Sequence, residues 1–257
     1  MDFSTKASSG LCSRFSSAVD AFVRAIASKW ANTTDFMLRS VLVNRVVYSD
    51  DFGRTWHSLG TIHTSPAPKG DEPKVEELPN GDVVLSSRAY GGRFFNVFHY
   101  MSHVNGTGVW ENDAVHSAEM PNGVKALQNS TNGEILIVQA VERATGKKMP
   151  LVLQSVPLGP GRANVGIYFK PLTSAQTYAT AKDFATDWSG PFQVSALLSA
   201  YSTMVQQKDG RIAFFYEEET YGKGLCYTNM YRPLTLEQIT GGKFAAISNK
   251  GSVNKRK

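Results

Sequence analysis

The stretch SDDFGRTW, residues 49–56, follows a strand-like run and fits the pattern Ser-x-Asp-x-Gly-x-Thr-Trp, known as an Asp box. In such a stretch Asp51 can accept backbone N–H bonds across a loop, Gly53 supplies a conformation closed to other residues, and Trp56 packs beneath. The combination predicts a self-contained hairpin turn between two strands. A turn of this kind indicates the fold far more strongly than the function.

A degenerate second copy of this turn occurs at residues 102–110, SHVNGTGVW. It has one extra residue, and Asn105 takes the place of the aspartate. The two copies are about 50 residues apart, which is the length of one four-stranded blade of a β-propeller. The repeat therefore predicts successive blades of antiparallel strands.

Beyond residue 40 the chain alternates short β-type runs with turn signals. Helical periodicity is nearly absent there, apart from a short stretch at residues 234–239. Several runs follow a pair that favours the positive φ of tight turns, namely Asn80-Gly81, Asn132-Gly133 and Asp209-Gly210. The runs are VLVNRVVYS, GDVVLSSR, FFNVFHYMS, EILIVQAVE, PLVLQSV, NVGIYFK, GRIAFFYEE and GLCYTNMY. We therefore predict an all-β chain built from antiparallel hairpins.

Composition excludes several classes of protein. The 257 residues are 42% hydrophobic and 19% charged, which suits a chain with a buried core. The formal charge of +5 is spread along the chain apart from a basic tail, so nucleic-acid binding is not expected. Two distant cysteines, Cys12 and Cys226, exclude a disulfide framework and leave one long-range bridge open. No apolar run approaches the roughly 20 residues that cross a bilayer and no secretory signal is evident, so no membrane span is expected.

Residues 1–42 match nothing downstream. A helix is expected over residues 15–30, because apolar residues recur there at helical spacing: Val19, Phe22, Val23 and Ile26. A second interpretation stays open, in which the segment is out-of-frame sequence. Ser28 to Arg39, back-translated and read two bases on, can give KVGKYYRLY, a strand-like run of the kind expected before the Asp box. The upstream nucleotide sequence decides between the two.

Four residues in three segments carry the candidate chemistry. Glu72 and Arg88 lie 16 positions apart in DEPKVEELPNGDVVLSSR, residues 71–88. Arg162 lies in GRANVGIY, and Tyr201 lies 39 positions further on in AYSTM. In their order and spacing these segments resemble the bacterial sialidases, or neuraminidases, which are glycosidases that remove terminal sialic acid. Each residue taken alone would more often be an ordinary strand or loop residue.

The resemblance implies a role for each of the four residues. Arg88 and Arg162 would bind the carboxylate of sialic acid, because guanidinium groups bind carboxylates in bidentate geometry. Tyr201 would be the nucleophile, because a neutral phenol is not repelled by the anionic substrate as a carboxylate would be. Glu72 would take the phenol proton, because a free phenol has a pKa of about 10 and needs a base. No metal and no organic cofactor is implied, and the five histidines lack metal-ligand spacing.

The resemblance is incomplete near the N-terminus. The family has an Arg-Ile-Pro segment bearing a third carboxylate-binding arginine and, further on, an aspartic acid that protonates the leaving group. Neither is recognisable here, because Arg14 and Asp20 are too close together. The resemblance implies a six-bladed catalytic domain, which at roughly 50 residues a blade needs about 300 residues or more, so about four blades fit into residues 43–247. We predict an incomplete six-bladed β-propeller, preceded by the atypical segment 1–42 and followed by a basic disordered tail at 248–257.

The resemblance implies a retaining exo-α-sialidase that hydrolyses terminal α-linked sialic acids of glycoproteins, glycolipids or free glycans. Low or absent activity is expected of the chain itself, because the third arginine and the acid are not recognisable. The alternative is a non-catalytic Asp-box propeller that binds sialic acid through Arg88 and Arg162, or that binds another protein. Relatives are usually exported, but the sequence indicates neither the localisation nor the linkage preference.

Overall fold

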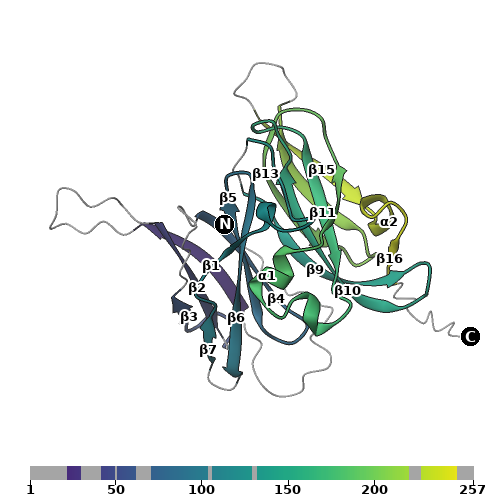
Figure 1. Ribbon diagram of the computed structural model, residues 1–257. Helices are drawn as coiled ribbons and strands as arrows, with labels where there is room; N and C mark the ends of the chain where they lie inside the picture. The colour runs from purple at the N-terminus through teal and green to yellow at the C-terminus, as the bar shows by residue number, and fades with distance from the viewer. Residues whose placement is uncertain are drawn as a thin grey trace, which may run out of the picture.

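The computed structural model describes the residue ranges 22–29, 42–49, 51–61, 71–103, 106–128, 132–219 and 227–247. Within them the chain is mostly strand and forms four antiparallel sheets (Figure 1). This architecture confirms the predicted all-β class. The predicted tail, residues 248–257, lies outside the described residues, as does most of the segment 1–42.

The first sheet contains β1 (Phe22–Lys29), β2 (Leu42–Ser49) and β3 (His57–Thr61). The helix predicted over residues 15–30 is wrong for β1, which pairs antiparallel with β2 along its whole length. β2 is rich in valine, and its edge offers a ladder of backbone donors and acceptors that an extended partner satisfies. Helical spacing of a few apolar residues does not outweigh this pairing, because a short isolated helix is marginal in water. Residues 15–21 and 30 lie outside the described residues.

In the second sheet β4, β5, β6 and β7 follow one another in order, and β8 pairs with β6. These strands span Asp71–Glu77, Val83–Ala89, Gly92–Ser102, Thr107–Trp110 and Val115–His116. A 3-10 helix, η1 (Ser117–Glu119), follows β8. The predicted Asn80-Gly81 turn joins β4 to β5, and Gly81 has a φ of +89° there.

The third sheet has the order β12-β11-β10-β9-β16, and the fourth has the order β13-β14-β15. The third-sheet strands, from β9 to β12 and then β16, are Ile135–Glu142, Lys148–Pro157, Val165–Pro171, Ser189–Gln193 and Phe244–Ala246. The fourth-sheet strands, from β13 to β15, are Ser199–Gln206, Ile212–Glu218 and Thr228–Leu234. The helices η2, α1 and α2 are Ala175–Thr177, Ala181–Ala185 and Leu236–Ile239, so α2 confirms the helical stretch predicted at 234–239.

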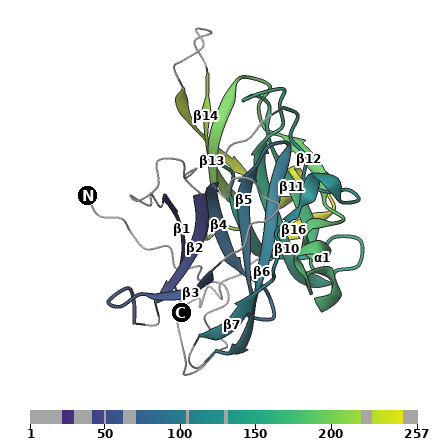
Figure 2. The same ribbon diagram turned by 60° about the vertical axis from the view of Figure 1, so that its left-hand side comes forward.

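The four sheets stack in sequence order. β1 contacts β4, β4 contacts β9 and β9 contacts β13, so the first strands of the sheets lie next to one another. Figure 2 shows the strands of the first two sheets side by side along this stack. Apolar side chains fill the spaces between sheets, for example Leu59, Leu85 and Phe98, then Val84, Phe95 and Val152, then Leu153, Met204 and Phe214. The stacking is the one expected of propeller blades around a common axis.

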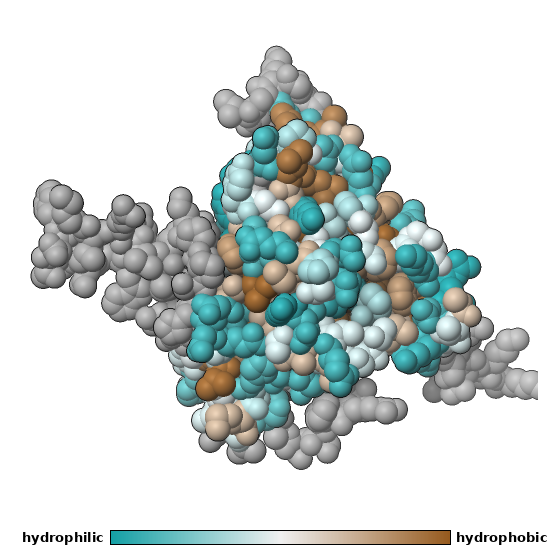
Figure 3. All heavy atoms as spheres, viewed as in Figure 1, coloured by the Kyte–Doolittle hydropathy of each residue, from teal (hydrophilic) through white to brown (hydrophobic). Residues whose placement is uncertain are grey.

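The last sheet of the stack carries exposed aromatic side chains. Phe215 on β14 and Tyr231 on β15 are 47% and 45% exposed, and their ring centroids are 4.9 Å apart. On the face seen in Figure 3, hydrophobic side chains gather near the top, over this sheet. The stack of described sheets therefore ends on a partly apolar surface.

The turn between β2 and β3 has the hydrogen bonds that the Asp box predicts. Asp51 Oδ1 accepts the backbone N–H groups of Arg54 and Thr55 at 2.9 and 2.8 Å. The bond from the Thr55 amide is the largest of the effects that hold the pKa of Asp51 well below its usual range. Gly53 has a φ of +84°, which a side chain would strain. Trp56 does not pack into the core: it is 42% exposed, and its ring lies beside Gly53.

The degenerate copy of the turn lies between β6 and β7, with residues 104–105 outside the described residues. Its tryptophan, Trp110, is buried, and its indole N–H donates to the Leu59 carbonyl at 2.7 Å. Because Leu59 belongs to β3, this hydrogen bond joins the second sheet to the first.

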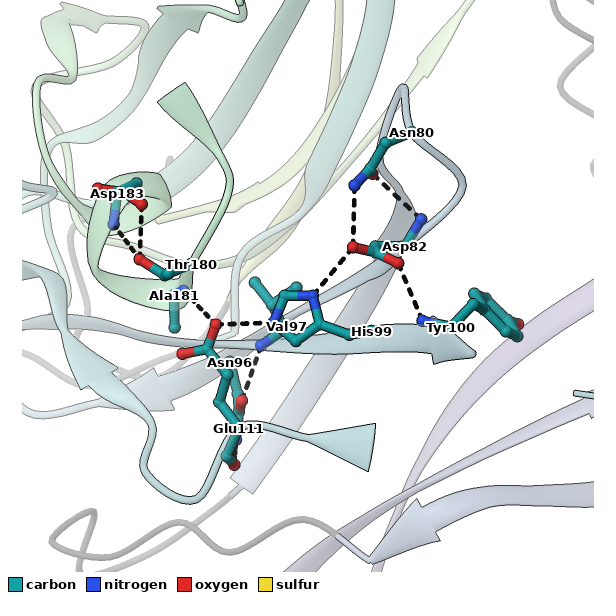
Figure 4. A network of polar contacts seen from close by, with 10 residues as sticks. All are labelled: Asn80, Asp82, Asn96, Val97, His99, Tyr100, Glu111, Thr180, Ala181 and Asp183. Atoms are coloured by element: carbon teal, nitrogen blue, oxygen red, sulfur yellow. Dashed lines mark hydrogen bonds and ion pairs between the residues drawn. The ribbon is translucent and has the colours of Figure 1, made fainter. Parts of the chain in front are cut away.

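A polar network on the second sheet is centred on His99 (Figure 4). Its ring nitrogens lie 3.0 Å from Asp82 Oδ2 and 3.0 Å from Glu111 Oε1. Asp82 also accepts the Tyr100 amide, and Glu111 accepts the Ala181 amide at the start of α1. Burial opposes the charged imidazolium, but the hydrogen bonds to the two carboxylates raise the pKa of His99 above its ordinary value. The network ties the β4–β5 turn, β6 and α1 together.

Candidate active site

The four side chains singled out in the sequence lie together, although they come from three sheets. Glu72 is on β4, Arg88 is on β5, and Tyr201 is on β13. Arg162 lies in the loop between β10 and β11. The Tyr201 hydroxyl donates to Glu72 Oε1 at 2.6 Å, and Arg88 Nη1 donates to the same oxygen at 2.8 Å.

Glu72 occupies an irregular place at the start of β4. The pairing of β4 with β5 shifts register between Asp71 and Lys74, and Glu72 lies inside this bulge with a φ of +43°. Such a backbone conformation is costly for a residue that has a side chain, and bulges often re-aim side chains beside active sites. The bulge leaves the carboxylate facing Tyr201 on another sheet.

Tyr201 lies in a second irregularity. The pairing of β13 with β14 shifts register between Ser199 and Ser202, and the Tyr201 amide donates to Glu217 Oε2 at 3.2 Å. The hydrogen bond to Glu72 is the largest of the effects that raise the pKa of the Tyr201 phenol, and burial adds to it. The positive charges of Arg162 and Arg88 oppose the rise. The phenol is therefore protonated at neutral pH, and an acceptor for its proton is in place.

Arg162 is exposed, and its guanidinium carbon lies 5.9 Å from the centroid of the Tyr201 ring. Its loop is fixed to β13, because the Ser199 amide donates to the Arg162 carbonyl at 2.8 Å. In the described part of the chain no carboxylate forms an ion pair with Arg162. Its guanidinium can therefore bind an anion from outside the chain.

A second group of polar residues is Lys74, Glu134 and Thr203, which contact one another next to the Glu72–Tyr201 pair. Glu134, just before β9, accepts the Thr203 hydroxyl at 2.5 Å and forms an ion pair with Lys74 at 3.6 Å. Lys74 and Thr203 follow Glu72 and Tyr201 by two residues on β4 and β13. This spacing is a signal that the sequence interpretation did not use.

Charged side chains of both signs lie in or next to the site in the part of the chain that the structure describes. Its cations are Lys74, Arg88, Arg93 and Arg162, and its carboxylates are Glu72, Glu134 and Glu217. Sequence reasoning missed Arg93, because a fully buried arginine cannot be distinguished from an exposed one by sequence pattern.

Neither a metal site nor a membrane helix is found in the ranges that the structure describes. No group of three or more histidine, cysteine, aspartate or glutamate side chains there is arranged to hold a metal ion. In the same ranges no helix is long and apolar enough to cross a membrane.

Known structures resemble the chain in fold. An intramolecular trans-sialidase from Ruminococcus gnavus, solved with oseltamivir carboxylate, shares 17% identity over 78% of this chain, with a TM-score of 0.54. A Dyadobacter fermentans protein of unknown function shares 10% identity over 90% of this chain and 63% of its own, with a TM-score of 0.51. An α-L-arabinofuranosidase from Fusarium graminearum shares 14% identity over 89% of this chain and 65% of its own, with a TM-score of 0.47.

The chain has a β-propeller fold. The matched region is 41% of the length of the trans-sialidase, so the chain spans less than half of that protein. No protein-family model matches the sequence, and no curated protein matches it either. At such low identities these likenesses show the fold alone, and the predicted total of six blades stays a prediction.

Proposed function

We propose that the chain carries the nucleophile and carboxylate-binding part of an exo-α-sialidase site, which cleaves terminal α-linked sialic acids with retention. One observation carries the proposal: the Tyr201 phenol donates to the Glu72 carboxylate at 2.6 Å, with Arg88 and Arg162 beside the pair. Most glycosidases use a carboxylate nucleophile, and sialidases are an exception that uses tyrosine. The likeness in fold to a trans-sialidase is in keeping with this chemistry.

Substrate binding rests on the two arginines. Sialic acid carries a carboxylate on its anomeric carbon, and a guanidinium group can bind both oxygens of a carboxylate at once. Arg162 has no acidic partner among the described residues, and Arg88 already touches the catalytic carboxylate. A substrate carboxylate held between them brings the anomeric carbon toward the Tyr201 oxygen.

The first chemical step forms a bond from the Tyr201 oxygen to the anomeric carbon and breaks the bond from that carbon to the leaving oxygen. The phenol proton passes to Glu72 along their existing hydrogen bond. In the second step water attacks the same carbon, Glu72 returns its proton to Tyr201, and the proton of the water is released to solvent. Two inversions at one carbon give net retention.

The leaving oxygen also needs a proton. The aspartic acid that supplies it in the sialidase family has no recognisable counterpart in these 257 residues, and neither has the third arginine. Water must then supply the proton, which penalises poor leaving groups. We expect slow turnover of an aryl sialoside, whose phenolate departs easily, and much slower turnover of a natural sialyl-lactose.

The test compares release of a fluorogenic phenol from an aryl sialoside by the purified chain and by two variants. Tyr201→Phe is expected to abolish the turnover. Tyr231→Phe is the matched control, because Tyr231 is an exposed tyrosine on β15 whose hydroxyl accepts a hydrogen bond from Gln207. Equal rates for the chain and for Tyr201→Phe, or no turnover by the chain, would reject the proposal.

A second candidate function is binding of sialic acid without catalysis. Arg162 favours it, because this arginine is exposed and has no acidic partner among the described residues. A propeller that only binds sialic acid would use Arg162 and Arg88 in the same way. It would bind a sialoside without turnover, keep that affinity in Tyr201→Phe and bind roughly tenfold more weakly in Arg162→Ala.

A further inference from the structure

A chain of buried polar side chains crosses three sheets beneath the candidate active site. Its members, which we call the polar bridge, are Arg93, Ser86, Gln154, Ser155 and Ser202. Four of them have no exposed surface, and Ser202 is 5% exposed. Polar groups buried this deeply destabilise a fold unless they are hydrogen-bonded.

Within the second sheet the bridge begins at Arg93 on β6. Its guanidinium donates to the Ser86 hydroxyl and to the Ser86 carbonyl, both at 2.9 Å. Ser86 on β5 then donates across to the third sheet, where Gln154 Oε1 on β10 accepts at 2.7 Å. This bond fixes the second sheet to the third.

From β10 the bridge continues to the fourth sheet. Neighbouring residues of a strand point to opposite faces, so Gln154 faces the second sheet while Ser155 faces the fourth. The Ser155 and Ser202 hydroxyls are hydrogen-bonded at 2.8 Å, and Ser155 Oγ also accepts the Glu134 amide at 2.9 Å. Ser202 directly follows Tyr201 on β13.

Both ends of the bridge therefore lie close to the proposed reacting groups. Ser86 is paired in register with Lys74, two residues after Glu72, and Arg93 is paired with Arg88. Glu72 and Tyr201 belong to different sheets, so their 2.6 Å hydrogen bond depends on how those sheets are held relative to each other. The bridge links the second and fourth sheets by hydrogen bonds on the two faces of β10, which the backbone between Gln154 and Ser155 joins.

We propose that the polar bridge is a positioning device, which holds the Tyr201 hydroxyl against the Glu72 carboxylate by fixing the second, third and fourth sheets in register. The proposal rests on the proposed function only in treating Tyr201 and Glu72 as the reacting pair. An apolar core could stabilise the sheets equally well, whereas directional bonds at about 2.8 Å specify one arrangement of them.

The test titrates the Tyr201 phenol by its ultraviolet absorbance, with the spectrum of Tyr201→Phe subtracted. The hydrogen bond to Glu72 raises the pKa of this phenol, so loosening the pair lowers its titration midpoint. Ser155→Ala removes the hydroxyl that bonds to Ser202 and to the Glu134 amide, and so interrupts the bridge. Ser117→Ala is the matched control, because Ser117 is also fully buried and its hydroxyl also makes two bonds, to the Ala185 carbonyl and the Val124 amide.

Ser155→Ala is expected to move the Tyr201 midpoint to lower pH, while Ser117→Ala leaves it in place despite a similar loss of stability. Ser202→Ala is a milder cut that keeps the Ser155 bond to the Glu134 amide, and it should give a shift of the same sign. An unchanged midpoint in both bridge variants, or an equal shift in Ser117→Ala, overturns the proposal. The titration needs no turnover, so an inactive wild-type chain would reject the proposed function and still leave this test decisive.

Discussion

Replacing Arg162 by alanine should weaken binding of a sialoside only through the carboxylate of the sugar. The guanidinium lies over the Tyr201 ring at 5.9 Å, and the Ser199 amide holds its backbone in place. Its charge lowers the pKa of the Tyr201 phenol, but no described carboxylate pairs with it. The substitution therefore removes a ligand-binding cation without unpairing a partner.

Exposure sets the size of the effect. A hydrogen bond between charged groups contributes about 1.5 to 3 kcal/mol. Water screens an exposed guanidinium such as that of Arg162, so the lower end of this range applies. Because 1.4 kcal/mol is about a tenfold change in affinity, we expect Arg162→Ala to bind methyl α-sialoside roughly tenfold more weakly.

The assay is a thermodynamic cycle measured by titration calorimetry at constant salt. Wild type and Arg162→Ala are each titrated with methyl α-sialoside and with its carboxyl methyl ester, which lacks the negative charge. Wild type should prefer the acid, and in Arg162→Ala this preference should be roughly tenfold smaller, with the remainder contributed by Arg88. Arg211→Ala is the control, because Arg211 is another exposed arginine and is paired with Asp209 at 2.7 Å. An acid-to-ester ratio that is the same in wild type and Arg162→Ala would refute the role of Arg162.

Three further predictions concern the scaffold. Asp51→Ala should speed hydrogen exchange of the Thr55 amide in the β2–β3 turn, because Asp51 accepts that N–H at 2.8 Å; unchanged exchange would contradict the turn. The pKa of His99 is higher in the folded state, so the charged imidazolium stabilises the fold. This stabilisation is fully present below about pH 6.5 and is lost as the pH rises through the folded-state pKa. His99→Gln should therefore lower the urea midpoint more at acidic than at alkaline pH, and an equal loss at both would contradict the network. Phe95→Ala should lower the free energy of unfolding by about 3 to 5 kcal/mol, because Phe95 is fully buried against the rings of Phe184 on α1 and Trp188. A loss below about 1 kcal/mol would be inconsistent with that packing.

Local signals made most of the fold predictable. The turn at residues 49–56 and the Asn80-Gly81 turn depend on residues that contact one another within a few positions, so their chemistry can be read directly. β1 was missed because its conformation depends on pairing with β2, which spacing along β1 does not reveal. β16 was missed for the same reason, since it pairs with β9, a hundred or so residues earlier.

The residues of the candidate site also divide into those that the local sequence indicates and those that depend on contacts between distant segments. Glu72, Arg88, Arg162 and Tyr201 could be predicted because each lies in a short segment that resembles a known family. Arg93 and Glu134 carry no such local mark, and their environment arises only when three sheets pack together. A resemblance between segments can thus single out candidate residues, while the buried polar residues around them are recognised only in the folded chain.

The most direct test of the account is whether Tyr201 forms a bond to the sugar. A sialosyl fluoride with a second fluorine beside the anomeric carbon suits this test, because fluoride departs without an acid and the second fluorine slows breakdown of the glycosyl-enzyme. After incubation with the purified chain, mass spectrometry of the peptides should find the sugar on Tyr201, with no adduct in Tyr201→Phe. A sugar attached to a carboxylate such as Glu72, or no adduct while the sugar is bound, would contradict the account.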